Sequence, residues 1–151
     1  MGRTVGSASG GLGLEIAAVA LGGVVGTGLR LLADAALPHA AHEFPTSTLI
    51  VNVVGALTLG VLVGEVWKRP GLPRWLRAGL GAGVLGSFTT YSAIMVSLVG
   101  MGSADALGLA AIYLAASLVL GFGAAALGLR IGSAAAHRRM PRSIDDAGET
   151  L

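Results

Sequence analysis

Four long apolar stretches, separated by short polar segments, make up most of this chain. They cover about residues 14–37, 47–67, 76–101 and 106–131. Each exceeds the roughly 20 residues that a helix needs to cross a hydrocarbon core about 30 Å thick. The pattern therefore predicts an all-α integral membrane protein in which four transmembrane helices form one domain over residues 14–132.

The segments that flank this domain are polar or rich in small residues. We expect residues 1–13, rich in glycine and serine, to be a flexible N-terminus, and residues 133–151 to be a polar cytoplasmic tail. A cleaved signal peptide is disfavoured, because the first apolar span is too long for one and contains Arg30.

The third span is interrupted between Gly79 and Ile94 by small and hydroxyl-bearing residues. These are Gly81, Gly83, Gly86, Ser87, Thr89, Thr90 and Ser92. Irregular backbone at membrane depth is tolerated only where protein buries it or where it lines a cavity. We expect a broken third helix with the break at Gly86. Close helix packing is the alternative, since glycine, serine and threonine let backbones approach.

Composition and charge narrow the class of protein. The chain is 54% hydrophobic, only 12% charged and free of cysteine, so disulfides and thiolate sites are excluded. No Walker, Rossmann or nucleophile-elbow motif occurs, and we expect no enzyme activity.

The cations indicate one fixed orientation in the cell membrane. Of the ten Lys and Arg residues, Arg30 lies inside a span, and threading four helices places the other nine on one side. Cytoplasmic loops carry this excess, so both termini and the loop at 68–77 are predicted to be cytoplasmic. The excess of Lys and Arg therefore indicates membrane orientation and not a nucleic-acid binding site.

Several polar side chains lie inside the spans and are candidates for contact with an ion. The Asn52 carboxamide could donate to an anion or could bond a neighbouring helix. Tyr113 and Ser117 are four residues apart, so their hydroxyls share a helix face and could form a polar track or interhelical contacts. Arg30 could snorkel to the interface or attract an anion.

Other ionisable residues have simpler interpretations. Glu15 could exchange protons and cations, but a carboxylate in the first turn of a helix more often complements the helix dipole. His39, His42 and Glu43 are close together in a loop, where a metal site would need a fixed scaffold, so we do not expect one.

Motifs in all four spans, taken in order, resemble those of the Fluc/CrcB fluoride channels. They are Gly22-Gly-Val-Val-Gly-Thr-Gly-Leu-Arg30, Pro45-Thr-Ser-Thr-Leu-Ile-Val-Asn-Val-Val-Gly55, Gly86-Ser-Phe-Thr-Thr-Tyr-Ser92, and Tyr113 with Ser117. Ser47 stands where the family pattern has glycine. The resemblance covers about residues 14–132.

This resemblance implies an antiparallel dimer with two narrow pores that pass fluoride down its electrochemical gradient and so lower fluoride toxicity. It also implies a structural Na⁺ on the dimer axis, held by the backbone carbonyls of Gly86 and Thr89. The implied pore-lining residues are Asn52, Thr90, Tyr91, Ser92, Ile94, Tyr113 and Ser117, with Arg30 as the cation of the first helix.

Two departures from the family pattern lead to a more specific hypothesis. The family has two phenylalanines where this chain has Tyr91 and Ile94, and the strong cation bias is unexpected in a dual-topology homodimer. Together they suggest one half of an antiparallel heterodimer with a paralogous partner. The alternatives are a small multidrug-type proton-coupled exchanger that uses Glu15, and a non-conducting partner subunit.

Overall fold

A computed structural model describes residues 6–40 and 43–138. Within these ranges the chain forms helices joined by short loops, without a strand. The same ranges contain four segments that are long and apolar enough to cross a membrane: Gly11–Ala36, Thr46–Lys68, Arg74–Ser103 and Leu107–Arg138. The prediction of an all-α protein with four candidate membrane spans is confirmed.

Three of the spans are continuous helices. These are α1 (Gly6–Ala36), α2 (Thr46–Gly64, followed by the 3₁₀ turn η1, Val66–Lys68) and α6 (Leu107–Arg138). α1 begins eight residues before residue 14, and α6 ends seven residues after residue 131, because no proline interrupts either extension and elongating a helix is easier than nucleating one. The rest of the predicted N-terminus and tail lies outside the described residues.

The third span consists of several consecutive pieces. α3 (Arg74–Ala78) leads into a π-helical segment, η2 (Gly79–Leu85), and then into α4 (Gly86–Phe88). The backbone is extended at Thr89, with φ −76° and ψ 152°, and α5 (Ser92–Ser103) follows. Gly86 itself is helical, so the expected break position was wrong. The helix ends at Phe88: Thr89 N–H still donates to Leu85 O as in a helix, whereas Thr90 N–H donates to the Asn52 side chain.

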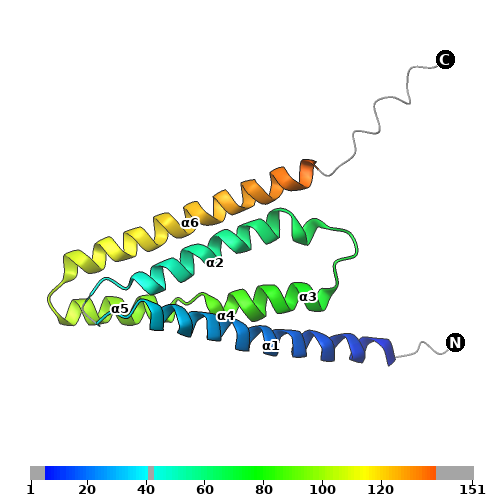
Figure 1. The fold of residues 1–151 in the computed structure, drawn as a ribbon, viewed down its shortest axis with the longest axis horizontal. Coiled ribbons are helices and arrows are strands. Elements are labelled where there is room, and N and C mark those ends of the chain that lie inside the picture. Colours follow the sequence, from blue (N-terminus) through cyan, green and yellow to red (C-terminus); the bar gives the residue numbers. More distant parts are fainter. Residues whose placement is uncertain (1–5, 41–42, 139–151) are drawn as a thin grey trace, which may run out of the picture.

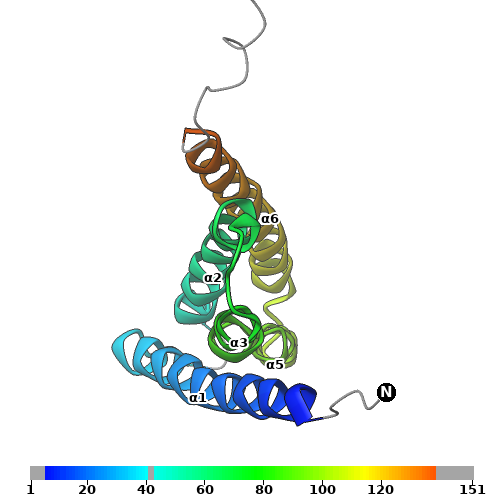
Figure 2. The same ribbon diagram turned by 90° about the vertical axis from the view of Figure 1, so that its right-hand side faces the viewer.

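The helices pack in two groups (Figures 1 and 2). α2 packs along α6, whereas α1 packs against α3, η2 and α4, and α5 contacts α6. The α1–α2 and α5–α6 connections lie at one end of the bundle. The α2–α3 loop, the N-terminal end of α1 and the C-terminal end of α6 lie at the other end. The cations of the 68–77 segment therefore gather at the end that also holds Arg138.

Glycines bring the helix backbones into contact within each group. A Cβ at Gly22 or Gly26 of α1 would overlap backbone of the third span, at the Gly79 or Val84 carbonyl oxygen. The predicted Gly22-x-x-x-Gly26 packing motif therefore has a partner surface. Small residues at such positions allow the close van der Waals contact on which helix association in lipid depends.

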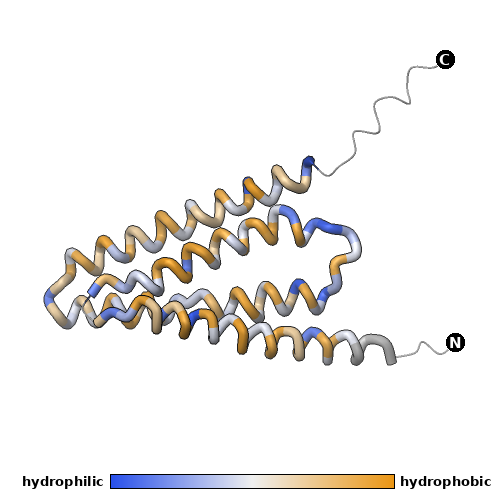
Figure 3. The backbone as a smooth tube through the Cα atoms, viewed as in Figure 1, coloured by the Kyte–Doolittle hydropathy of each residue, from blue (hydrophilic) through white to orange (hydrophobic). Residues whose placement is uncertain are grey.

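Apolar residues run along all four spans (Figure 3), and many of their large side chains are exposed on the outside of the bundle. Leu21 and Val24 of α1, for example, are 69% and 72% exposed. The best-buried large side chains, Tyr113, Met101 and Val51, form only a small interior. Helices that are apolar on their outer faces and loosely buried are expected where lipid, and not water, surrounds the bundle.

Candidate functional site

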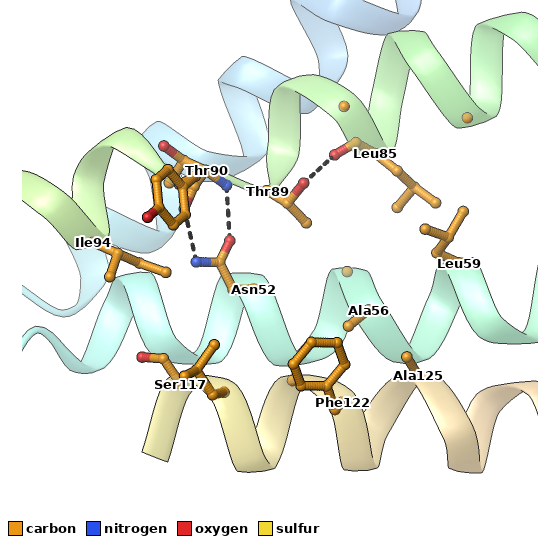
Figure 4. Close-up of a pocket in the computed structure, with 16 residues that line it drawn as sticks. Asn52, Ala56, Leu59, Leu85, Thr89, Thr90, Ile94, Ser117, Phe122 and Ala125 are labelled. Carbon is orange, nitrogen blue, oxygen red and sulfur yellow. Dashed lines mark hydrogen bonds between the residues drawn. The ribbon is translucent and has the colours of Figure 1, made fainter. Parts of the chain in front are cut away.

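Asn52 joins the middle of α2 to the non-helical turn of the third span. Its Nδ2 donates to the Thr90 carbonyl at 2.9 Å, and its Oδ1 accepts from the Thr90 backbone N–H at 2.8 Å (Figure 4). Thr90 lies outside a helix, and this paired contact gives both its backbone N–H and its backbone C=O a hydrogen-bond partner. The helix–helix hydrogen bonding considered for Asn52 is therefore present, and one Nδ2 hydrogen remains for a second acceptor.

Two carbonyl oxygens of the third span lack their helical donors at this turn. In an uninterrupted helix, Gly86 O would accept from Thr90 N and Thr89 O would accept from Ala93 N. Thr90 N instead donates to Asn52, and Ala93 N donates to Thr90 Oγ1 at 3.3 Å. Within the described chain, neither carbonyl accepts a backbone hydrogen bond. Both residues line the adjoining hollow.

A hollow of about 620 Å³ lies between α2, the third span and α6, and we call it the central hollow. Asn52, Thr90, Tyr91, Ile94 and Ser117 all line it, although they come from three separate spans. Figure 4 shows Asn52 and Ser117 on neighbouring helices, with Ile94 beside them. Five of the seven predicted pore-lining residues are therefore brought together.

Tyr113, also predicted to line the pore, lies outside the lining of this hollow. Its side chain is fully buried among Met101, Ala110 and Phe44, whose ring meets the tyrosine ring edge-on at a centroid distance of 5.4 Å. The Tyr113 and Ser117 hydroxyls are both buried and lie close to each other, and neither bonds to a described residue outside this pair. Buried polar atoms in native proteins nearly always have partners, and Trp67 Nε1 is the third such atom without one among the described residues.

The aromatic groups of the central hollow differ from those expected. Tyr91 is 71% exposed at the lining, and Ile94 packs partly against the core near Met101. Phe122 of α6 also lines the hollow and is 75% exposed, a position that the sequence analysis missed. Leu118, Phe122 and Ala125 line the hollow together, and their spacing of four and then three residues along α6 was the available signal.

A second, smaller hollow of about 320 Å³ lies beside α1, and we call it the α1-side hollow. Arg30 and Ser92, the remaining predicted residues, line it together with Thr48. Thr90 lines both hollows, and its hydroxyl lies 3.1 Å from that of Ser92. Thr90 therefore lies between the two hollows.

Comparisons with known proteins identify the family of this chain. The family described as "CrcB-like protein, Camphor Resistance (CrcB)" matches residues 17–129. The chain belongs to the CrcB-like family. A relative from Agrobacterium fabrum, named "Fluoride-specific ion channel FluC", is 40% identical over 120 residues, 79% of this chain and 96% of its own. A relative of the same name from Novosphingobium aromaticivorans is 45% identical over 116 residues, 75% and 91% of the two chains.

A third CrcB-like relative, from Leifsonia xyli, is named "Fluoride-specific ion channel FluC 2". It is 38% identical over 130 residues, 84% of this chain and 89% of its own. These names and the four candidate spans make the chain a multi-pass membrane protein of an ion-channel family. The prediction that it is not an enzyme is confirmed by this membership.

The charged residues considered for other functions lie away from both hollows. Glu15 is well inside α1 and not in its first turn, so the helix-dipole interpretation was wrong. Its Oε1 pairs with Arg74 Nε at 3.2 Å, and it precedes the matched family region. Glu43 accepts from the Ala40 backbone N–H, and the described residues contain no cluster of three metal-ligating side chains. His42 lies outside the described residues.

Proposed function

We propose that this chain is a subunit of a fluoride-conducting channel in the cell membrane. Conduction would be passive, so fluoride would leave the cell down its electrochemical gradient and its toxicity in the cytoplasm would fall. Family membership supports this proposal, because the CrcB-like relatives are named as fluoride-specific ion channels. The structural observation that carries it is the pair of buried hydroxyls, bonded to no described residue outside the pair, beside a mostly apolar hollow that Asn52, Thr90 and Ser117 also line.

Fluoride is small and strongly hydrated, so a narrow pathway must replace its water with other donors. The Tyr113–Ser117 pair retains one hydroxyl hydrogen when one hydroxyl donates to the other, and Asn52 retains one Nδ2 hydrogen. The Tyr91 ring offers a positive edge at the lining of the central hollow. Hydrogen-bond donors outnumber charges along this route, which favours a small anion that accepts strong hydrogen bonds.

The open side of the central hollow favours a second subunit. Tyr91 and Phe122 are large aromatic residues, and both remain mostly exposed at its lining. A second four-helix subunit, inserted in the opposite direction, would cover them and close the pathway at the subunit interface. The proposed antiparallel dimer therefore needs no rearrangement of the contacts within this chain.

A heterodimer remains the preferred form of this dimer. The cations gather at one end of the bundle, which favours a fixed orientation with both termini cytoplasmic. Tyr91 and Ile94 replace the two expected phenylalanines, which an oppositely oriented paralogue could supply. The numbered name of the Leifsonia xyli relative is consistent with paralogous chains.

The residues at the turn fit the proposed structural Na⁺. Gly86 and Thr89 each present a carbonyl oxygen that accepts no backbone hydrogen bond in the described chain. Carbonyl oxygens are suitable ligands for a hard cation, and two subunits would supply four of them. When bound, the ion would balance these dipoles and link the third spans of the two subunits.

Fluoride efflux from liposomes, followed with an ion-selective electrode, tests the proposal. The chain would be reconstituted alone and then with a paralogous CrcB-like chain, with chloride as the control anion. Fluoride efflux without chloride efflux is expected in the paired sample. Efflux from the chain alone would contradict the heterodimer and leave the channel function intact.

Two alternative functions predict different results in the same assay. A non-conducting partner subunit would allow efflux in the pair that is unaffected by removal of the Ser117 hydroxyl. An exchanger would show no fluoride efflux and would instead require the Glu15 carboxylate. The pairing of Glu15 with Arg74, away from both hollows, favours the channel over the exchanger.

A further inference from the structure

The α1-side hollow contains a carboxylate as well as a guanidinium. Arg30 and Asp34 are one turn apart on the same face of α1, and both line the hollow. Asp34 lies closer to the C-terminal end of α1, near the α1–α2 connection. An anion that reaches Arg30 from that end therefore passes Asp34 first.

A buried hydroxyl fixes the position of this carboxylate. Ser47, which is completely buried at the start of α2, donates to Asp34 Oδ1 at 2.7 Å. Among the described residues, Asp34 forms no ion pair with Arg30. The negative charge is thus held at the hollow instead of being neutralised by the nearest cation.

The surroundings of Asp34 offer no other charge that would cancel it. The lining from α2 and α5 consists of Thr48, Ser92 and apolar residues, none of them titratable. The other described acidic or histidine side chains at this end, on His39, Glu43 and Asp105, do not line the hollow. Arg30 and Asp34 are therefore the two charges that an ion meets there.

We propose that Asp34 limits the access of anions to the pathway from the α1-side hollow, and so helps to determine its conductance. This inference rests on the proposed channel function and adds a specific residue to it. The physical reason is direct: a carboxylate beside a narrow opening repels an approaching anion, and local charge sets the concentration of permeant ions at such an opening. Ser47 positions the carboxylate and does not contact the ion.

A purely structural role for Asp34 would give a different result on substitution. Asp34→Asn removes the charge but keeps an oxygen that can accept from Ser47, so the link between α1 and α2 survives. Ser47→Ala removes the link and keeps the charge. Asp105→Asn is the matched control, because Asp105 lies at the same end, outside the hollow, and its φ of 55° is one that asparagine tolerates well.

The test measures fluoride efflux from liposomes. They contain this chain alone or with its paralogous partner, whichever of the two samples conducts. Asp34→Asn is expected to raise the initial rate about two- to fivefold, the effect of one partly screened charge, while Asp105→Asn leaves it unchanged. The gain should shrink in about 1 M of an impermeant salt, where the Debye length falls to about 3 Å.

The possible outcomes separate this inference from the function on which it rests. An unchanged or lower rate for Asp34→Asn, in a protein that conducts, would overturn the inference alone. A loss of efflux in both Asp34→Asn and Ser47→Ala would identify a structural link and overturn it too. No fluoride efflux from any of the proteins would overturn the proposed function, and the inference with it.

Discussion

The two halves of α6 are buried in different ways. In the C-terminal half, Gly128 and Gly132 press against α2, and a Cβ on either would overlap the carbonyl oxygen of Leu57 or Val61. In the N-terminal half, Tyr113 and Ser117 bury hydroxyls that bond to no described residue outside this pair. One half is closed by backbone contact, and the other buries polar groups with spare hydrogen-bonding capacity.

This difference separates stability from function along one helix. Backbone contact at small residues favours assembly in lipid, where apolar side chains gain little by leaving the bilayer. Buried hydroxyls without partners cost stability, so their presence indicates a task that needs available donors. Substitutions in the two halves should therefore change different measurements.

Gly128→Val should have the largest effect. The added side chain would force α2 and α6 apart where Gly60 also contacts the α6 backbone. Because the clash is with backbone, we expect a loss of at least about 3 kcal/mol, at the upper end for overpacking. Thermal unfolding of the protein in detergent would measure it.

A matched control comes from the same helix. A Cβ at Gly108 of α6 would meet no other atom within 4 Å, so Gly108→Val should leave stability nearly unchanged or raise it slightly, because valine has a somewhat higher helix propensity than glycine. Equal destabilisation by both variants would mean that the α2–α6 contact is not what stabilises this half of the helix.

Tyr113→Phe and Ser117→Ala should change function without loss of stability. Each removes a buried hydroxyl that bonds to no described residue outside the Tyr113–Ser117 pair, so the unfolding temperature should change little. Fluoride efflux should fall at least about tenfold for each, since a hydrogen bond to a charged group contributes about 1.5–3 kcal/mol. A lower unfolding temperature with normal efflux would show that these hydroxyls stabilise the fold instead.

Much of this division was predictable from the sequence, because it depends on local spacing. The apolar spans gave the four membrane helices, and the four-residue spacing of Tyr113 and Ser117 placed them on one face. The glycines and hydroxyls of the third span marked where it is irregular. Spacing along a helix reports which residues share a face, and it needs no knowledge of the partner helix.

The contacts between distant residues could not be predicted in the same way. Asn52 was a candidate, but its pairing with the Thr90 backbone depends on where the third span leaves helical geometry, which was expected at Gly86. Asp34 and Ser47 are 13 residues apart across a loop, and nothing in either local pattern links them. Such contacts depend on how helices are placed in space, which local periodicity does not specify.

The Glu15→Gln substitution should have the smallest effect, because Glu15 belongs to neither half of this comparison. It pairs with Arg74 near the cation-rich end, where Arg74 is 90% exposed, so we expect a stability change below about 1 kcal/mol. Fluoride efflux should also be unchanged, since Glu15 lines neither hollow. A parallel assay of proton-coupled cation uptake tests the exchanger alternative. If Glu15→Gln abolished such uptake in a protein without fluoride efflux, the first span would carry the function, and the buried hydroxyls of α6 would need another explanation.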